Sequence, residues 1–485
     1  MGASATDAAH GSLPTANPRH VEQAPRAERT AHAEHTEHER TTLGSGVRVI
    51  SEQIPGVRSV ALGFWIATGS AAERDGEAGI SHLLEHMLFR GTARYGSEEI
   101  DQIFDEMGAE INAGTDKEAT SLYTRVLDGH LERAFDVMGD MIWRPRMGEL
   151  EAEREVVLEE IAMYEDDPQD RVFDLISGAV FGAHPLGRAV IGRAEVIAGV
   201  TRDQLEVFHG ERYTPANIVV AAAGSLEHDA LVELVATSER ASGHGHGADV
   251  DGAEQARPSA ADGVAAIPAA PPRPDLAARV EFLEKDTEQY HVCIGAPAIA
   301  RDDERRFALR VLEGVLGGTT SSRLFQEVRE RRGLAYSVFS YSSLYAHAGE
   351  FGIYVGTRPE NLEQALAVVA AELERCLADP ASEEELVRSR ENLKGRMVLG
   401  LESTGARMSR LGGAVLSGLP VLSVNEMIDR VDAVAIADIR ELAHELFAPR
   451  RLSVAGIGPS RSHFEGAIGA LGAAAPASEV KVSRS

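Results

Sequence analysis

Leu83-Leu-Glu-His-Met-Leu88 returns later in the chain as Val311-Leu-Glu-Gly-Val-Leu316, and this recurrence determines how the 485 residues are organised. A second pair keeps the same order, since Tyr213-Thr-Pro215 matches Phe447-Ala-Pro449 and both precede an apolar run. The two pairs are offset by 228 and 234 residues. Because self-similarity at a nearly fixed spacing indicates repeated structure, the sequence predicts two copies of one fold of about 200 residues.

Both copies combine alternating apolar patterns, which are typical of strands, with amphipathic helical patterns. The sequence therefore predicts the α+β class, with two homologous domains, each a mainly antiparallel β-sheet packed with α-helices, joined by a flexible linker. A chain of this length has room for such domains, each with its own core. The expected organisation is a disordered N-terminal tail at 1–40, a first domain at 41–240, a flexible linker rich in Gly, Ala and Pro at 241–275, a second domain at 276–472 and a disordered tail at 473–485.

The composition excludes several classes of protein. A hydrophobic fraction of 44% with 26% charged residues is typical of a globular protein, and no apolar run predicts a transmembrane segment, so we expect no membrane partner. The N-terminal residues 1–40 lack the apolar centre of a secretory signal and are too acidic for a mitochondrial presequence. The two cysteines, Cys293 and Cys376, cannot form a disulfide framework, so we expect a cytoplasmic protein. The net charge of −28 opposes binding to nucleic acid and favours basic partners, unless it serves solubility alone.

A histidine pair lies in and beside the first hexapeptide. The alternating apolar residues at 60–66 predict a strand, and a helix is expected to begin near Gly79. In that helix His82 and His86 lie four residues apart and Glu85 lies three residues after His82, so all three share one face. Two imidazoles one helical turn apart suit a zinc ion. Because the chain has 17 histidines, a solvated surface helix is the competing interpretation of this motif alone.

A catalytic zinc site needs a third protein ligand and leaves its fourth position open. The acidic segment 149–165 is predicted to be a helix, in which Glu153 and Glu160 lie seven residues apart on one face. We expect Glu160 to be the third metal ligand and Glu153 to be a carboxylate that orients a histidine or the bound water. Helical geometry alone does not exclude Glu159 as the ligand.

Together, His82-Leu-Leu-Glu-His86 and Glu153-Arg-Glu-Val-Val-Leu-Glu-Glu160 resemble the pitrilysin, insulin-degrading and mitochondrial processing family of zinc metallopeptidases, whose inverted zinc motif is His-x-x-Glu-His. The resemblance covers both halves of the chain. It selects Glu160 as the third ligand, and it implies one Zn²⁺ per chain and a catalytic domain at 41–240. It also implies an endopeptidase that hydrolyses extended or unfolded peptides, in which Glu85 takes the proton of the water and later delivers it to the leaving amine.

The second copy is not expected to hold a metal. At the positions equivalent to the two histidines it carries Arg310 and Gly314. It does contain Arg329-Glu-Arg-Arg-Gly-Leu-Ala-Tyr336, which looks like the family segment whose Arg and Tyr reach into the active site. The resemblance implies that Tyr336 stabilises the oxyanion and that Arg329 binds the substrate backbone. The competing interpretation is a basic helix end followed by a core tyrosine.

Expectations about substrate and partners follow from the same resemblance. The segment 108–115 is predicted to be an edge strand, and the family's Asn-Ala pair, here Asn112 and Ala113, pairs with a peptide substrate as an added strand. An ordinary turn is the competing interpretation. Chains of this length resemble the processing-peptidase branch, which implies pairing of two chains as a homodimer or heterodimer. Separately from the resemblance, the net negative charge leads us to expect basic peptides as substrates.

Two other functions stay open at this point. The first is a non-catalytic scaffold subunit of the same family, and the second is a peptide-binding clamp that uses zinc only structurally. The intact His82, Glu85, His86 and Glu160 argue against the scaffold subunit, because such subunits commonly lose some of these groups. A structural zinc site normally has four protein ligands, and no fourth candidate lies at a fitting spacing.

Overall fold

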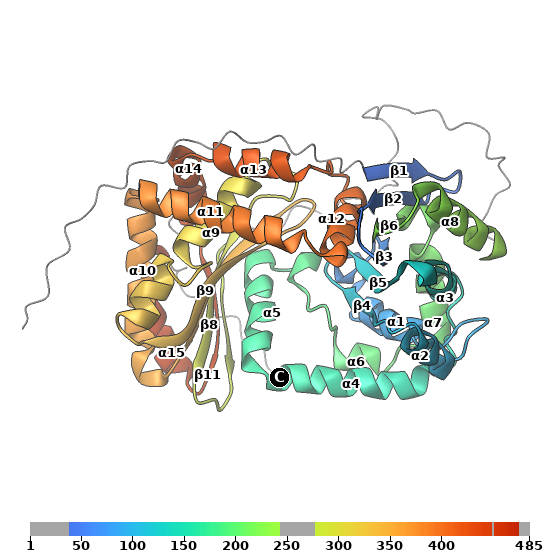
Figure 1. The fold of residues 1–485 in the computed structure, drawn as a ribbon. Helices are drawn as coiled ribbons and strands as arrows, with labels where there is room; N and C mark the ends of the chain where they lie inside the picture. The colour runs from blue at the N-terminus through green and yellow to red at the C-terminus, as the bar shows by residue number, and fades with distance from the viewer. Residues whose placement is uncertain (1–37, 243–276, 449–450, 475–485) are drawn as a thin grey trace, which may run out of the picture. The chain divides into compact units, whose positions relative to one another are not determined.

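The structure is a computed structural model that describes residues 38–242, 277–448 and 451–474 (Figure 1). The first copy contains, in chain order, β1 (His38–Thr42), β2 (Arg48–Gln53), β3 (Ser59–Ile66), α1 (Ile80–Leu88), α2 (Ser97–Glu106), β4 (Ile111–Thr115), β5 (Thr120–Leu127), α3 (Leu131–Trp143), α4 (Leu150–Asp166), α5 (Pro168–Phe181), α6 (Ala194–Ile197), α7 (Arg202–Arg212), β6 (Ile218–Gly224) and α8 (His228–Ser242). The second copy contains β7 (Val280–Glu284), β8 (Tyr290–Ala298), α9 (Arg306–Leu316), the π-helical turn η6 (Phe325–Glu330), β9 (Ala335–Leu344), β10 (Gly349–Thr357), α10 (Leu362–Ala378), α11 (Glu383–Gly400), α12 (Thr404–Leu416), α13 (Val424–Ala433), α14 (Ile436–Leu446), β11 (Ser453–Gly458), α15 (Arg461–Ile468) and the 3₁₀ segment η8 (Gly469–Ala474).

Each copy is built around one β-sheet, and the two sheets have equivalent topology. The strand order is β1-β2-β6-β3-β5-β4 in the first sheet and β7-β11-β8-β10-β9 in the second. Without the additional β1, the strands correspond one to one along both sheets. In each sheet one neighbouring pair of described strands is parallel, β2 with β6 and β7 with β11, and the other pairs are antiparallel. The predicted fold class, two homologous α+β domains with mainly antiparallel sheets, is confirmed.

Local sequence patterns explain the elements near the candidate site. The alternating residues Val60, Leu62, Phe64 and Ile66 of β3 are fully buried, as a strand with one face on a helical layer requires. α1 begins directly after Gly79, where the sequence predicted a helix start.

The long helix α4 ends at a capping signal. Asp167 follows its last residue, and the Asp167 side chain accepts hydrogen bonds from the backbone N–H groups of Gln169 and Asp170. Pro168 occupies the first position of α5, where its missing N–H is not needed. The chain therefore turns sharply between α4, which carries predicted site residues, and α5.

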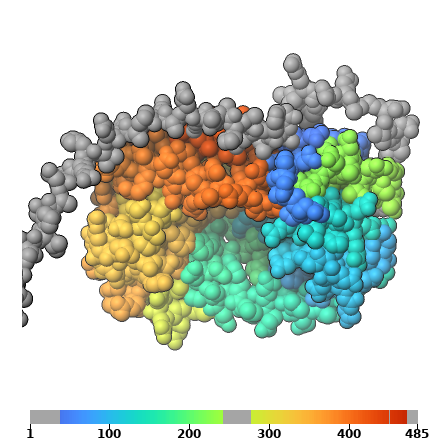
Figure 2. All heavy atoms as spheres, in the orientation of Figure 1, coloured from blue at the N-terminus to red at the C-terminus, as the bar shows by residue number. Residues whose placement is uncertain are grey.

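Each copy contributes one helix to a face of the other copy's sheet. α5 of the first copy packs on β7, β8, β10 and β11, whereas α12, which follows the long helix α11 in the same way, packs on β2, β3 and β6 (Figure 1). In Figure 2 the orange residues of the second copy lie directly against the blue residues of the first. Each copy therefore keeps a large core of its own, and two smaller apolar clusters around α5 and α12 contain residues of both copies.

A glycine in each central strand allows this close packing. A Cβ atom on Gly63 of β3 would lie 2.6 Å from Met408 Sδ of α12. A Cβ atom on Gly295 of β8 would lie 2.8 Å from Ile176 Cγ1 of α5. Both distances are shorter than any ordinary carbon contact, so the two exchanged helices approach their sheets at equivalent points.

The expected domain boundaries differ from the structure at one end. Residues 1–37 lie outside the described residues, but His38–Thr42 forms β1, which pairs with β2. The first domain therefore begins earlier than position 41. The sequence did not predict β1 as a strand, because its residues are largely exposed and lack an apolar alternation. The expected linker lies outside the described residues from 243 onward, and the expected C-terminal tail does so from 475 onward. Among the helices described, none has the length and apolar character needed to cross a membrane.

Candidate metal centre and active site

Three metal-donor atoms converge between α1 and α4. His82 Nε2 and His86 Nε2 lie 3.3 Å apart. Glu160 Oε2 lies 3.7 Å from His82 Nε2 and 3.4 Å from His86 Nε2. A tetrahedral zinc ion with ligand bonds of about 2.1 Å places its ligand atoms about 3.4 Å apart, so these side chains fit that ion. In residues 38–242, 277–448 and 451–474, no other group of three His, Cys, Asp or Glu side chains lies this close together.

Glu153 lies behind one of the two histidines. Its Oε1 is 2.7 Å from His86 Nδ1, and its Oε2 accepts a hydrogen bond from Arg90. A proton on Nδ1 that points to this buried carboxylate leaves Nε2 of His86 free to face the other donors. The structure thus places Glu153 in contact with His86, one of the two predicted histidine ligands.

The surroundings of His82 favour its neutral form. Burial, and after it the neighbouring His86, lower the pKa of His82 to about 4. A neutral imidazole is the form that binds a metal ion. This histidine is therefore ready to act as a ligand at neutral pH without first losing a proton.

Glu85 lies one turn from His82 on the same helix and contacts β4. Thr115 Oγ1 donates a hydrogen bond of 2.5 Å to Glu85 Oε2. Burial raises the pKa of Glu85, and the hydrogen bond from Thr115 acts in the opposite direction. A raised carboxyl pKa brings such a group closer to the range in which a general base works near neutral pH.

A cavity of about 350 Å³ opens beside these groups. It is lined by His82, Glu85, Gly114, Thr115, Glu160, Tyr164, Asp174, Val190 and Ile191. Burial raises the pKa of Asp174, whereas Lys117 and Arg171 oppose that rise. The sequence did not single out Asp174 or Tyr164, because each is one acidic or aromatic position among many in α4 and α5.

The buried residue Glu73 holds the start of α1 and was also missed by the sequence reasoning. Its carboxylate accepts hydrogen bonds of 2.9 Å from the backbone N–H groups of Gly79 and Ser81. These are otherwise unpaired N–H groups of the first turn, and α1 has no side-chain cap of its own. An acidic residue shortly before a helix that starts at glycine is the only signal that could have indicated this contact.

Asn112 and Ala113 lie on β4, the outer strand of the first sheet. β4 pairs only with β5, so its other edge is unpaired by any described strand. Asn112 Oδ1 accepts a hydrogen bond of 2.8 Å from the backbone N–H of Ala113. The next two residues, Gly114 and Thr115, line the cavity. The structure therefore places the predicted pair on an edge strand beside the metal-donor cluster rather than in an ordinary turn.

Arg329 and Tyr336 contact each other but do not line this cavity. Arg329 lies in η6 and Tyr336 in β9, and the Arg329 guanidinium carbon lies 4.5 Å from the centre of the Tyr336 ring. Tyr336 is 77% exposed, so it is not the core tyrosine of the competing interpretation. The structure brings these two predicted residues together, and it does not bring them to the donor cluster of the same chain.

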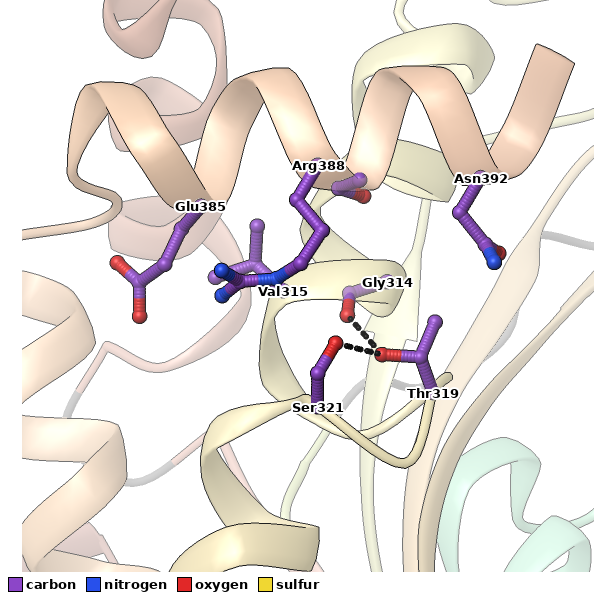
Figure 3. Close-up of a pocket in the computed structure, with 8 residues that line it drawn as sticks. Gly314, Val315, Thr319, Ser321, Glu385, Arg388 and Asn392 are labelled. Carbon is purple, nitrogen blue, oxygen red and sulfur yellow. Dashed lines mark hydrogen bonds between the residues drawn. The ribbon is translucent and has the colours of Figure 1, made fainter. Parts of the chain in front are cut away.

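The second copy has a different arrangement at the position equivalent to the metal centre. Figure 3 shows Gly314 of α9 facing Arg388, Glu385 and Asn392 of α11, with the Thr319 hydroxyl donating to the Gly314 carbonyl. The cavity there is only about 30 Å³. A Cβ atom on Gly314 would lie 2.3 Å from Ser389 Oγ, so a histidine would not fit without a further change. This agrees with the absence of a metal-donor group among the described residues of the second copy.

Known proteins resemble the chain over most of its length. A model described as "Insulinase (Peptidase family M16)" matches residues 48–194, and one described as "Peptidase M16 inactive domain" matches residues 199–393. An uncharacterized zinc protease of Streptomyces coelicolor is 43% identical over 423 residues, which cover 87% of this chain and 89% of that protein. An uncharacterized zinc protease of Bacillus subtilis is 39% identical over 412 residues, which cover 84% of this chain and 95% of that protein.

Solved structures share the fold. A protease from Helicobacter pylori has a TM-score of 0.78 at 22% identity and covers 87% of this chain and 100% of its own. A protein from Pseudomonas fluorescens, described as a peptidase M16 inactive domain, has a TM-score of 0.76 at 23% identity, with 87% of this chain and 98% of its own covered. The sequence relatives and the family models together establish the relationship that the zinc motif predicted: the chain belongs to peptidase family M16.

Proposed function

We propose that the chain is a zinc-dependent endopeptidase that binds one Zn²⁺ through His82, His86 and Glu160. The observation that carries this proposal is the set of donor separations, 3.3, 3.4 and 3.7 Å, which suits a tetrahedral ion. The names of the Streptomyces and Bacillus relatives, both zinc proteases, support the choice of metal. Three protein donors leave one position open, which favours a catalytic ion over a structural one.

In this proposal Glu85 is the general base. When bound, the zinc ion supplies a Lewis acid for the scissile carbonyl and the attacking water. Glu85 accepts a proton from that water and later delivers it to the leaving amine. The hydrogen bond from Thr115 to Glu85 Oε2 limits the rotation of this carboxylate. Glu153, through His86 Nδ1, keeps the histidine ring in the orientation that binding requires.

The proposed substrate is an extended or unfolded peptide that adds a strand to β4 at Asn112 and Ala113. The unpaired edge of β4, which leads into the cavity-lining residues Gly114 and Thr115, supports this placement. The carboxyl group of Asp174 in the cavity, together with the net charge of −28, favours basic side chains, whereas the charge of Glu160 is taken up by the proposed metal ion. Equal cleavage rates for Arg-containing and acidic peptides, at both low and moderate salt, would remove the preference for basic substrates.

Arg329 and Tyr336 complete the proposal as groups that bind substrate backbone and stabilise the oxyanion. Because neither residue lines the cavity of its own chain, this part requires a movement of the second copy or a contribution from a second chain. In a homodimer or a heterodimer, the second chain could bring its own Arg329 and Tyr336, or their equivalents, to this cavity. Tyr336 is exposed and therefore free for such a contact.

The decisive experiment combines metal analysis with a peptidase assay. Glu85→Gln preserves the size of the side chain, so the variant should retain one zinc per chain and lose hydrolysis by about 10²-fold to 10⁴-fold. The exposed Glu159→Gln on α4 is the matched control and should retain both zinc and activity. Undiminished cleavage by Glu85→Gln would refute the role of Glu85. A wild-type chain without zinc would favour the scaffold subunit, and zinc without cleavage would favour the peptide-binding clamp.

A further inference from the structure

The turn between β4 and β5, residues 116–119, connects the metal-donor cluster to the second copy. Thr115, which directly precedes this turn, lines the cavity and donates to Glu85. Within the turn, Asp116 Oδ1 accepts hydrogen bonds of 2.6 and 2.7 Å from the backbone N–H groups of Glu118 and Ala119. An aspartate that bonds the following backbone in this way fixes the shape of a turn. The direction of the Glu118 side chain is therefore set by the turn itself.

Glu118 binds the second copy. The backbone N–H of Ala346, in the turn between β9 and β10, lies 3.0 and 3.1 Å from the two carboxylate oxygens of Glu118. The same carboxylate forms an ion pair with Arg301, and the two side chains are only 23% and 30% exposed. Hydrogen bonds between ionised partners are stronger than those between neutral groups. This contact therefore has the character of a specific attachment, not of an ordinary surface ion pair.

Arg301 is itself held in place from two other sides. Its Nε donates 3.1 Å to the carbonyl oxygen of Leu344 at the end of β9. Its Nη1 donates 2.6 Å to Ser417 Oγ, and Ser417 directly follows α12, the helix that covers the first sheet. One guanidinium group thus joins the turn 116–119, β9 and the end of α12.

The first copy holds the turn independently of Glu118. The backbone N–H of Ser70 donates 3.1 Å to the Asp116 carbonyl, and the N–H of Ala71 donates 2.7 Å to the Lys117 carbonyl. These two bonds hold only residues 116 and 117, so the hairpin stays folded when the Glu118 side chain is changed, but they do not hold residues 118 and 119. The contribution that only Glu118 makes is the attachment of this turn to Arg301 and Ala346 of the second copy.

We propose that Glu118 is a positioning residue of the peptidase, which fixes the β4–β5 hairpin, and through Thr115 the carboxylate of Glu85, relative to the second copy. The effect on catalysis rests on the function proposed above, whereas the attachment does not. In this arrangement the second copy, although it lacks the zinc donors, takes part in the chemistry of the first. Loss of the attachment leaves the metal donors in place and lets β4 shift against Glu85.

The test compares Glu118→Ala and the milder Glu118→Gln with Asp128→Asn in the zinc-loaded full chain. Asp128 forms an ion pair with Arg58, whose side chain is 83% exposed, at the opposite end of β5 and is the matched control. A displaced catalytic group commonly costs up to about 100-fold in rate. We therefore expect kcat to fall between about 10-fold and 100-fold in Glu118→Ala, with unchanged zinc content and a smaller change in KM. We expect Arg301→Ala to reproduce this loss, Arg301→Lys to restore part of it, and the Glu118→Ala/Arg301→Ala double variant to lose little more than either single variant.

A second measurement separates this inference from the proposed function. Backbone hydrogen exchange in β4 and in the turn 116–119 should be faster in Glu118→Ala than in the wild type and in Asp128→Asn. If the wild-type chain hydrolyses no peptide, the proposed function fails, and the exchange experiment alone decides whether Glu118 fixes the hairpin. A kcat within about twofold of an active wild type overturns the inference. Exchange rates in β4 that match those of the wild type overturn it as well.

Discussion

The buried carboxyl group of Glu73 provides a prediction whose sign and size can be worked out from the structure. Glu73 is 4% exposed and binds the backbone N–H groups of Gly79 and Ser81 at the start of the zinc-motif helix. Burial raises the pKa of Glu73 from 4.5 to about 7, although the two backbone hydrogen bonds and the charge of Arg188 act against the rise. The charge of Glu73 also acts on Lys117, where it opposes the fall in pKa that burial causes. We predict the pH dependence of stability in Glu73→Gln.

The direction follows from proton linkage. Between pH 4.5 and 7 the unfolded wild-type chain has released the Glu73 proton, whereas the folded chain still holds it, so the contribution of Glu73 to wild-type stability falls as the pH rises. At about 1.4 kcal/mol per pH unit, the raised pKa corresponds to about 3 kcal/mol. The glutamine side chain of the variant cannot ionise and resembles the protonated acid in size. The variant should therefore gain about 3 kcal/mol of unfolding free energy relative to the wild type between about pH 4.5 and pH 8.

Urea unfolding of metal-free protein at several pH values measures this difference, since zinc binding adds its own pH dependence. Glu385→Gln is the control with the opposite behaviour. Burial raises the pKa of Glu385, but the hydrogen bonds from Arg323 and from the backbone N–H of Ser382 outweigh it and lower the pKa to about 2. The Glu385→Gln difference should therefore stay constant above about pH 5.5. The reasoning is refuted if the difference in unfolding free energy between Glu73→Gln and the wild type does not change with pH, or if it shifts in favour of the wild type as the pH rises. Either result would show that the two backbone hydrogen bonds outweigh burial.

Two further substitutions test the metal centre and the exchanged helix. Glu153→Gln should weaken zinc binding by about 10-fold to 100-fold, because it disturbs the contact to His86 Nδ1; titration against a competing chelator measures this, with the exposed Glu155→Gln as control, and equal affinities would exclude an orienting role. Ile176→Ala removes a fully buried side chain of α5 from the second sheet and should lower the unfolding free energy by about 2–5 kcal/mol; a loss below about 1 kcal/mol in urea unfolding would mean that α5 does not pack tightly there.

The sequence predicted those parts of the site that depend on spacing within one helix. His82, Glu85 and His86 lie on one helical face, and Glu153 and Glu160 lie seven residues apart on a second helix that faces them, although the family resemblance and not the spacing selected Glu160 over Glu159. Such spacings translate directly into geometry, since an α-helix repeats every 3.6 residues. The repeat of the hexapeptide predicted the equivalent topology of the two sheets for a similar reason, because similar local patterns form similar units.

Contacts between distant segments could not be predicted in this way. The capping signals in a sequence concern residues that directly flank a helix, whereas Glu73 lies six residues before Gly79 and reaches α1 through the fold. The apolar face of α5 indicates an amphipathic helix and says nothing about which sheet it covers. The attachment of Glu118 to Ala346 joins residues 228 positions apart, for which the chain contains no local pattern.

The exchange of α5 and α12 gives the second copy a structural role although it lacks a metal-donor group among its described residues. Without α12, a patch of the first sheet that includes Ala61, Val219 and Ala221 would face water. Exposure of such a contiguous apolar face is unfavourable, at about 25 cal/mol for each Å². The second copy, with Arg310 and Gly314 in place of the two histidines, therefore still serves as a cover for the first sheet. The contact of Arg301 with Glu118 adds a second link between the copies, because it ties the hairpin beside the metal-donor cluster to the second copy.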